Sequence, residues 1–167
     1  MYEKLRCDFA RYPFRKSRFW ALKLLFTSPG LSAVVVYRIQ QVLFQKNRLL
    51  LSYFFHRINL IYHSIDIVPG AQIGAGLRID HPVGIVIGSK VVIGENCTIL
   101  HGVTLGTRFL RSEQYDDEFP IIGDNVDIGC NSTILGKVVI GSRANIGANS
   151  LIIKSVPSDT TVTGVYS

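Results

Sequence analysis

The chain has 167 residues, of which 47% are hydrophobic and 18% are charged. This length and composition suit one folded core and exclude an intrinsically disordered chain. The net charge of +6 is unevenly distributed, because residues 1–62 contain eleven Lys and Arg against two acidic residues, whereas residues 63–167 contain seven basic and ten acidic residues. The basic character therefore belongs to the N-terminal third alone.

The first third predicts three apolar helices. The segment from Phe19 to Phe26 ends at Ser28-Pro29, a pair that also suits the first turn of a second helix running from Leu31 to about Phe44. A short polar turn then precedes a third helix, Leu49–Tyr62. We expect these helices to pack on one another, on another subunit or on lipid, because they are very apolar for helices surrounded by water.

The apolar and basic residues of the N-terminal third also indicate where in the cell the protein is located. The longest apolar stretches are Leu31–Tyr37 and Leu49–Phe55, far shorter than the roughly 20 residues that span a bilayer, and no signal peptide is evident. We therefore expect a cytoplasmic protein. Residues 1–62 can form a helical cap with a solvated basic face, or they can contact the inner face of the membrane peripherally.

From Ile65 an aliphatic residue recurs every six positions, usually followed by Gly or another small or acidic residue. A two-residue slip falls between Ile85 and Ile93, and residues 107–120 interrupt the repeat. A period of six fits neither a helix nor the alternation of a β-sandwich, but it fits three short strands per 18-residue coil. The clearest twelve hexads predict a mainly β fold, a parallel β-helix of about four coils over 65–167, after a basic helical segment at 1–64. The interruption predicts a loop on the binding face.

Three stretches of the repeat resemble the serine acetyltransferase family of hexapeptide-repeat acyltransferases. They are Asp66–Gly74, Ile79–Gly88 with its DH-x-x-G-I-V element, and Val103–Gly106 with the sequence VTLG. The resemblance covers 65–165 and is nearest to the short polysaccharide-biosynthesis type. It implies a left-handed β-helix, an acetyl-CoA co-substrate, and homotrimers or dimers of trimers with active sites between subunits.

Acetyl transfer to a hydroxyl requires a base, and the neutral imidazole of His81 occupies the family's catalytic position. Asp66 precedes His81 by fifteen residues, nearly one coil, and matches the family's partner carboxylate. Asp80, beside His81, also matches a position that the family uses. His56 and His63 are expected to be packing residues, and no group of Cys and His has metal-binding spacing.

The acceptor is predicted from His101 and from the loop. Serine-specific members carry Arg-His before the Pro that re-enters the repeat, whereas this chain has Glu118-Phe119 before Pro120. An acid cannot replace a guanidinium that holds a carboxylate. Tyr115, Glu118 and Phe119 instead suit a sugar, so the main expectation is a sugar or polysaccharide precursor. The alternatives are L-serine as acceptor and a non-catalytic trimeric scaffold.

The resemblance places the pantetheine arm of acetyl-CoA between adjacent β-helices. Backbone amides near Gly106, Asn131 and Ala148 are its expected partners, and Arg143 or Lys154 is expected to meet the phosphates. We expect no metal and no nucleic-acid partner.

Overall fold

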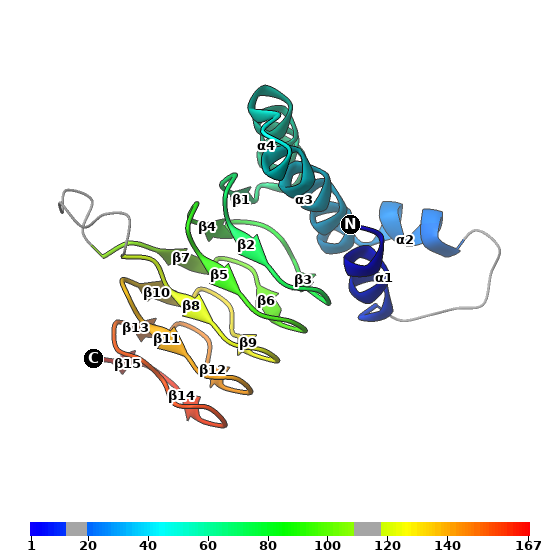
Figure 1. Cartoon of the computed structure of the whole chain (residues 1–167). Helices are drawn as coiled ribbons and strands as arrows, with labels where there is room; N and C mark the ends of the chain where they lie inside the picture. The colour runs from blue at the N-terminus through cyan, green and yellow to red at the C-terminus, as the bar shows by residue number, and fades with distance from the viewer. Residues whose placement is uncertain (13–19, 109–117) are drawn as a thin grey trace.

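The computed structural model describes residues 1–12, 20–108 and 118–167, where four helices are followed by fifteen short strands (Figure 1). The helices are α1 (Tyr2–Ala10), α2 (Trp20–Thr27), α3 (Pro29–Gln45) and α4 (Leu49–His63). The strands are β1 (Asp66–Ile67), β2 (Gln72–Ile73), β3 (Arg78–Asp80), β4 (Val86–Ile87), β5 (Val92–Ile93), β6 (Thr98–Leu100), β7 (Thr104–Gly106), β8 (Ile121–Ile122), β9 (Asp127–Ile128), β10 (Thr133–Leu135), β11 (Val139–Ile140), β12 (Asn145–Ile146), β13 (Leu151–Ile152), β14 (Thr161–Val162) and β15 (Val165–Tyr166).

The strands form a parallel β-helix. Consecutive strands pass in turn to a six-stranded sheet (β1-β4-β7-β10-β13-β15), a four-stranded sheet (β11-β8-β5-β2) and a five-stranded sheet (β14-β12-β9-β6-β3). Equivalent aliphatic residues stack from coil to coil inside, as Ile67, Ile87 and Leu105 do, and all three are fully buried. The predicted fold class, a β-helix of hexapeptide repeats behind an N-terminal helical segment, is confirmed.

Two details of the predicted repeat were wrong. The fifteen strands make about five coils instead of the predicted four. The sequence pattern missed strands at the ends because the inward residue there is not followed by Gly, as in Ile67-Val68 and Val162-Thr163. The slip was also misplaced by one strand. Ile87 pairs in register with Ile67, so the two extra residues lie between Ile79 and Ile87 and not after Ile85.

The helices α2, α3 and α4 lie close to their predicted ranges, whereas α1 was not predicted because its nine residues mix charged and apolar side chains. Pro29 occupies the first turn of α3, where its missing N–H costs no hydrogen bond. Ser64, in the left-handed conformation, ends α4. Among the residues that the structure describes, no helix is long and apolar enough to cross a membrane.

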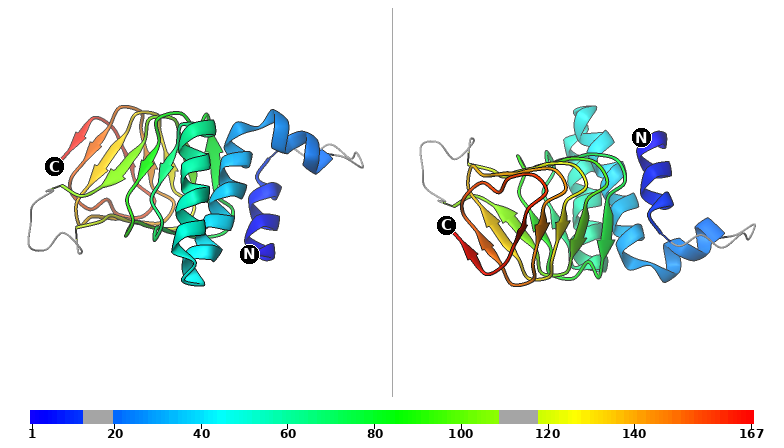
Figure 2. Two further views of the ribbon diagram at one scale, coloured as in Figure 1. Left: turned by 90° about the horizontal axis from the view of Figure 1, so that it is seen from above. Right: turned by 90° about the horizontal axis from the view of Figure 1, so that it is seen from below.

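The helices gather at the β1 end of the β-helix, and the C-terminus lies at the other end (Figure 2). The guanidinium of Arg38 is buried there and forms a bidentate ion pair with the fully buried Asp8, with N···O distances of 2.8 and 2.9 Å. Arg38 also donates to the carbonyls of Ile73 and Gly74 at the edge of β2. Asp8 in turn accepts from the backbone N–H of Leu77 at 2.9 Å. The ion pair thus joins α1 and α3 to the first coil.

The edges of β3 and β1 are covered in the same way. The hydroxyl of Tyr12 donates to the carbonyl of Ile79 and accepts from its N–H, both at 3.1 Å. The amide of Gln40 donates to the carbonyl of Ile67 at 2.7 Å. Side chains from the helical segment therefore satisfy backbone groups that the first coil would otherwise leave unpaired.

Candidate active site

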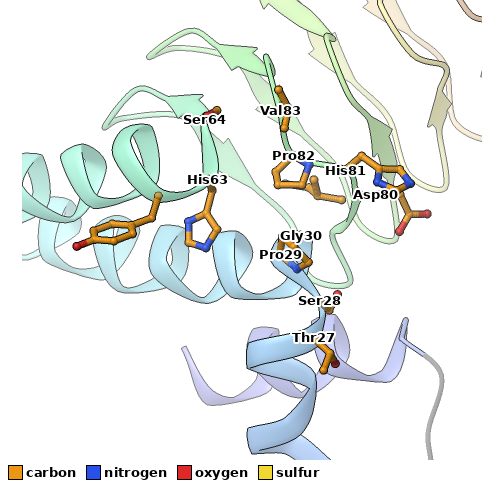
Figure 3. Close-up of a pocket in the computed structure, with 12 residues that line it drawn as sticks. Thr27, Ser28, Pro29, Gly30, His63, Ser64, Asp80, His81, Pro82 and Val83 are labelled. Atoms are coloured by element: carbon orange, nitrogen blue, oxygen red, sulfur yellow. The ribbon is translucent and has the colours of Figure 1, made fainter.

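A pocket of about 400 Å³ lies where the start of α3, the end of α4 and the corner between β3 and β4 meet (Figure 3). Its lining residues are Thr27, Ser28, Pro29, Gly30, Tyr62, His63, Ser64, Ile79, Asp80, His81, Pro82 and Val83. The predicted base and one predicted carboxylate, His81 and Asp80, therefore border one cavity. In Figure 3 their side chains lie on one side of the cavity and His63 on the other.

His81 is exposed because of the local backbone. The corner after β3 contains the two extra residues of the first coil, and His81 adopts φ of 58° there. The same left-handed conformation recurs at Asn131 and Asn149, at the same corner of later coils, so it belongs to the turn geometry of the β-helix. Gly84, with φ of 74°, returns the chain to the six-stranded sheet. The imidazole is exposed at this corner and does not belong to the buried aliphatic core.

The close approach of α3 to this corner depends on Gly30. A Cβ at Gly30 would lie 1.8 Å from the carbonyl oxygen of Ile79. The first turn of α3 therefore rests directly on the backbone of β3, one residue before Asp80. Glycine at this position sets one wall of the pocket.

The sequence predicts that Asp66 is the partner carboxylate of His81, but in the structure the side chain of Asp66 contacts His56 instead. Asp66 Oδ1 lies 2.8 Å from His56 Nε2, and within the described residues no hydrogen bond or ion pair connects Asp66 with His81. Asp80 is held by Arg78, whose Nε lies 3.0 and 3.2 Å from the two carboxylate oxygens. The orienting role predicted for Asp66 stays a prediction.

His63 enters the pocket although the sequence assigned it to packing. Its Nδ1 lies 3.0 Å from Asn59 Oδ1, and its Nε2 is hydrogen-bonded to the hydroxyl of Ser32. Burial lowers the pKa of His63, so its neutral form is favoured near pH 7. Because both ring nitrogens are engaged, His63 is less suited than His81 to accept a proton from a substrate.

The spacing of polar residues along α4 is a sequence signal for the positions of His56 and His63. Four polar residues recur along α4 at spacings of four, three and four, which is the pattern of one helix face. They are Ser52, His56, Asn59 and His63. Apart from Arg57, the other residues of α4 are aliphatic or aromatic, so this stripe indicates the side that faces the rest of the protein.

His101 lies one coil after His81, as predicted. Their rings form an edge-to-face pair with centroids 6.2 Å apart. Both residues stand at the corner between the five-stranded and six-stranded sheets, where Asn131 and Ala148 follow on later coils. This column of corner residues contains the predicted base, one predicted acceptor residue and two predicted donor contacts.

The described ends of the loop lie at the opposite edge of the six-stranded sheet. The loop leaves after Gly106 and returns at Glu118 to the four-stranded sheet, so one chain does not bring Glu118 next to His81. Phe119 is only 7% exposed and packs in the core, so its buried ring is not available to stack on a sugar as predicted. The other predicted aromatic, Tyr115, lies outside the described residues.

The two residues predicted to meet the phosphates of CoA lie at different corners of the β-helix. Lys154 is exposed on the edge from which the loop leaves. Arg143 instead lies at the corner between the four-stranded and five-stranded sheets and forms a bidentate ion pair with Asp159, with distances of 2.6 and 2.7 Å. Within the described ranges, no group of three His, Cys, Asp or Glu side chains could hold a metal ion.

Comparisons with known proteins agree with this architecture. The family model "Bacterial transferase hexapeptide (six repeats)" matches residues 119–154. A serine acetyltransferase of Staphylococcus epidermidis is 39% identical over 165 residues, which are 99% of this chain and 75% of the relative. A solved serine acetyltransferase in complex with CoA is 34% identical, with a TM-score of 0.83. The structure of Neisseria gonorrhoeae serine acetyltransferase in complex with serine is 37% identical, with a TM-score of 0.81.

These solved structures cover 96% and 98% of this chain, and the chain spans 66% and 64% of their lengths. The fold and the repeat define a transferase of the hexapeptide-repeat class with a left-handed β-helix. The extent of the sequence identity goes further, and the chain belongs to the serine acetyltransferase family.

Proposed function

We propose that this protein transfers the acetyl group of acetyl-CoA to the hydroxyl of L-serine. The observation that carries the proposal is identity to serine acetyltransferases over nearly the whole chain, with His81 and Asp80 on one pocket. Relatives of known structure contain CoA in one case and serine in another. The comparisons thus favour the serine alternative over the sugar acceptor that the loop sequence suggested, and they give no direct support to polysaccharide biosynthesis.

In this mechanism His81 accepts the proton of the serine hydroxyl while the oxygen attacks the thioester carbonyl. The tetrahedral intermediate collapses, the bond from carbon to sulfur breaks, and the CoA sulfur takes the proton back from the imidazolium. The products are O-acetylserine and free CoA. The carboxylate of Asp80, which Arg78 holds in place, borders the same pocket beside His81.

The active enzyme is proposed to be a homotrimer in the cytoplasm. His81 and Glu118 lie at opposite edges of the six-stranded sheet, so a neighbouring chain is needed to bring Glu118 close to His81. Such an arrangement also leaves the grooves between β-helices for acetyl-CoA, with contacts near Gly106, Asn131 and Ala148. Lys154 remains a candidate for the phosphates, whereas Arg143 is already paired with Asp159.

The test measures release of free CoA with L-serine, and with nucleotide-linked or lipid-linked sugars, as acceptors. We expect turnover with serine and a loss of about 10²- to 10⁴-fold for His81→Ala, the usual contribution of a general base. Asp66→Asn is expected to lose less than His81→Ala. Turnover of a sugar but not of serine would overturn the proposed acceptor, and a loss below about tenfold for His81→Ala would mean that another group is the base.

A second set of outcomes concerns the scaffold alternative. Lys137→Gln, an exposed change on the turn before β11, serves as the matched control and should keep full activity. If neither the parent protein nor the control releases CoA with any acceptor while both are folded, the protein is not an acetyltransferase. Cellular complementation by His81→Ala would then support a scaffold.

A further inference from the structure

The polarity of α4 is inverted relative to a typical surface helix. Ser52 and Asn59, both fully buried, face the rest of the protein. The hydroxyl of Ser52 donates to the carbonyl of Gln40, and the amide of Asn59 donates to the carbonyl of Ala33. The inner face of α4 is thus held to α3 by hydrogen bonds, and its apolar side chains are left for the other side.

The outer face of α4 is an exposed apolar surface. Its members are Leu49, Leu50, Leu51, Tyr53, Phe54, Leu60, Ile61 and Tyr62. Leu50 is 90% exposed, Ile61 72% and Phe54 59%. Exposed apolar side chains gathered on one helix in this way mark a surface that binds another molecule, because leaving them in water is unfavourable.

The charges around this face have one sign. Residues 9–65 contain nine Lys and Arg and not one Asp or Glu. Arg57 lies on the outer face itself, and Lys46 and Arg48 lie at its N-terminal end, all three exposed. A long basic side chain can place its charge beside an apolar surface while its methylene groups remain in it.

We propose that the outer face of α4 binds an anionic membrane surface, with the helix lying in the plane of the interface. Apolar and aromatic side chains would enter the boundary between headgroups and acyl chains, and Lys46, Arg48 and Arg57 would meet lipid phosphates. The fifteen residues of α4 extend about 22 Å, too short to span the hydrocarbon core.

A twofold contact between the α4 outer faces of two chains fits this surface less well. If two outer faces met, Arg48 and Arg57 of both copies would approach each other, and residues 9–65 supply no carboxylate to pair with them. Like charges in a contact of low dielectric are unfavourable. An anionic lipid surface supplies the missing negative charge.

The experiment is co-sedimentation of the full chain with vesicles of phosphatidylcholine, alone or with phosphatidylglycerol, at low and high salt. We expect binding at least about tenfold tighter to the anionic vesicles, weakened by salt. Arg57→Gln should weaken binding about fivefold, and Lys137→Gln, at an exposed position on the β-helix, should not.

Apolar contact is tested with Ile61→Ser, which should reduce binding at least about tenfold. Val165→Ser is the matched control, because Val165 is also 72% exposed but lies in β15 at the far end of the molecule (Figure 1). Unchanged melting temperatures establish that the variants are folded.

Equal binding to neutral and anionic vesicles, or no binding to either, would overturn the proposal. A change in oligomeric state of Ile61→Ser by light scattering, with no effect on vesicles, would identify the face as a subunit contact and also overturn it. Acetyltransferase assays on the same samples report separately on the proposed catalytic function.

Discussion

Removal of Arg38 should destabilise the protein strongly. Arg38→Met keeps most of the side-chain volume but leaves the carboxylate of Asp8 buried without its cation. Breaking a buried ion pair in this way costs about 3–5 kcal/mol, a large part of the roughly 5–15 kcal/mol that stabilises a domain. For a chain of this size the loss corresponds to a decrease in melting temperature of roughly 6–20 °C.

A second substitution separates charge burial from lost packing. Asp8→Asn in the Arg38→Met background removes the stranded charge, and the Asn side chain can still accept from the N–H of Leu77. We expect the double variant to recover about half of the lost free energy of unfolding. Arg143→Met, which breaks the exposed ion pair with Asp159, is the control and should leave the melting temperature nearly unchanged.

The assay is urea unfolding followed by circular dichroism at a fixed protein concentration, since assembly also contributes to stability. The reasoning is refuted if Arg38→Met costs less than about 1 kcal/mol. It is also refuted if adding Asp8→Asn makes Arg38→Met less stable, because that result would mean that the carboxylate is not a burden without its partner.

Three further predictions concern the site and the thiols. Gly30→Ala forces α3 away from the carbonyl of Ile79, so kcat/KM should decrease at least about tenfold; an unchanged value would show that the pocket wall can move freely. Because burial lowers the pKa of His63, the unfolded state binds its proton more tightly, so the free energy of unfolding should fall as the pH decreases below about 6.5. Urea unfolding at pH 7.5 and 5.5 should show a smaller difference for His63→Gln than for the parent, and an equal difference contradicts the assignment. Burial raises the pKa of the Cys97 thiol to about 11, so iodoacetamide at pH 8 should modify the exposed Cys7 and spare Cys97 in the folded protein; mass spectrometry showing equal rates would contradict this.

The β-helix was predictable because its core imposes a strict rule on the sequence. Each coil places one aliphatic residue inward every six positions, and a period of six differs from those of helices and sandwiches. The rule weakens at the ends, where Ile67 and Val162 lack a following glycine, and those strands were missed. The slip was misplaced because Ile85 and Ile87 are both fully buried, so either could be read as the repeating position.

The site was only partly predictable for a related reason. His81 and Asp80 are adjacent in sequence, and one coil separates His81 from His101, so the repeat alone brings these residues near one another. The contact of Asp66 with His56 depends on how α4 lies against β1, which no local pattern specifies. Composition also described α4 as uniformly apolar and concealed that its two faces differ.

The way in which Arg38, Tyr12 and Gln40 bond to the first coil has a consequence for assembly. A parallel solenoid has no inherent beginning, since the outer backbone groups of its first coil are oriented to pair with another coil, including one from a second molecule. Here those groups on Ile67, Ile73 and Ile79 are already occupied by side chains of the helical segment. The segment therefore caps the first coil, and a chain without it would expose three strand edges that could pair with a second molecule.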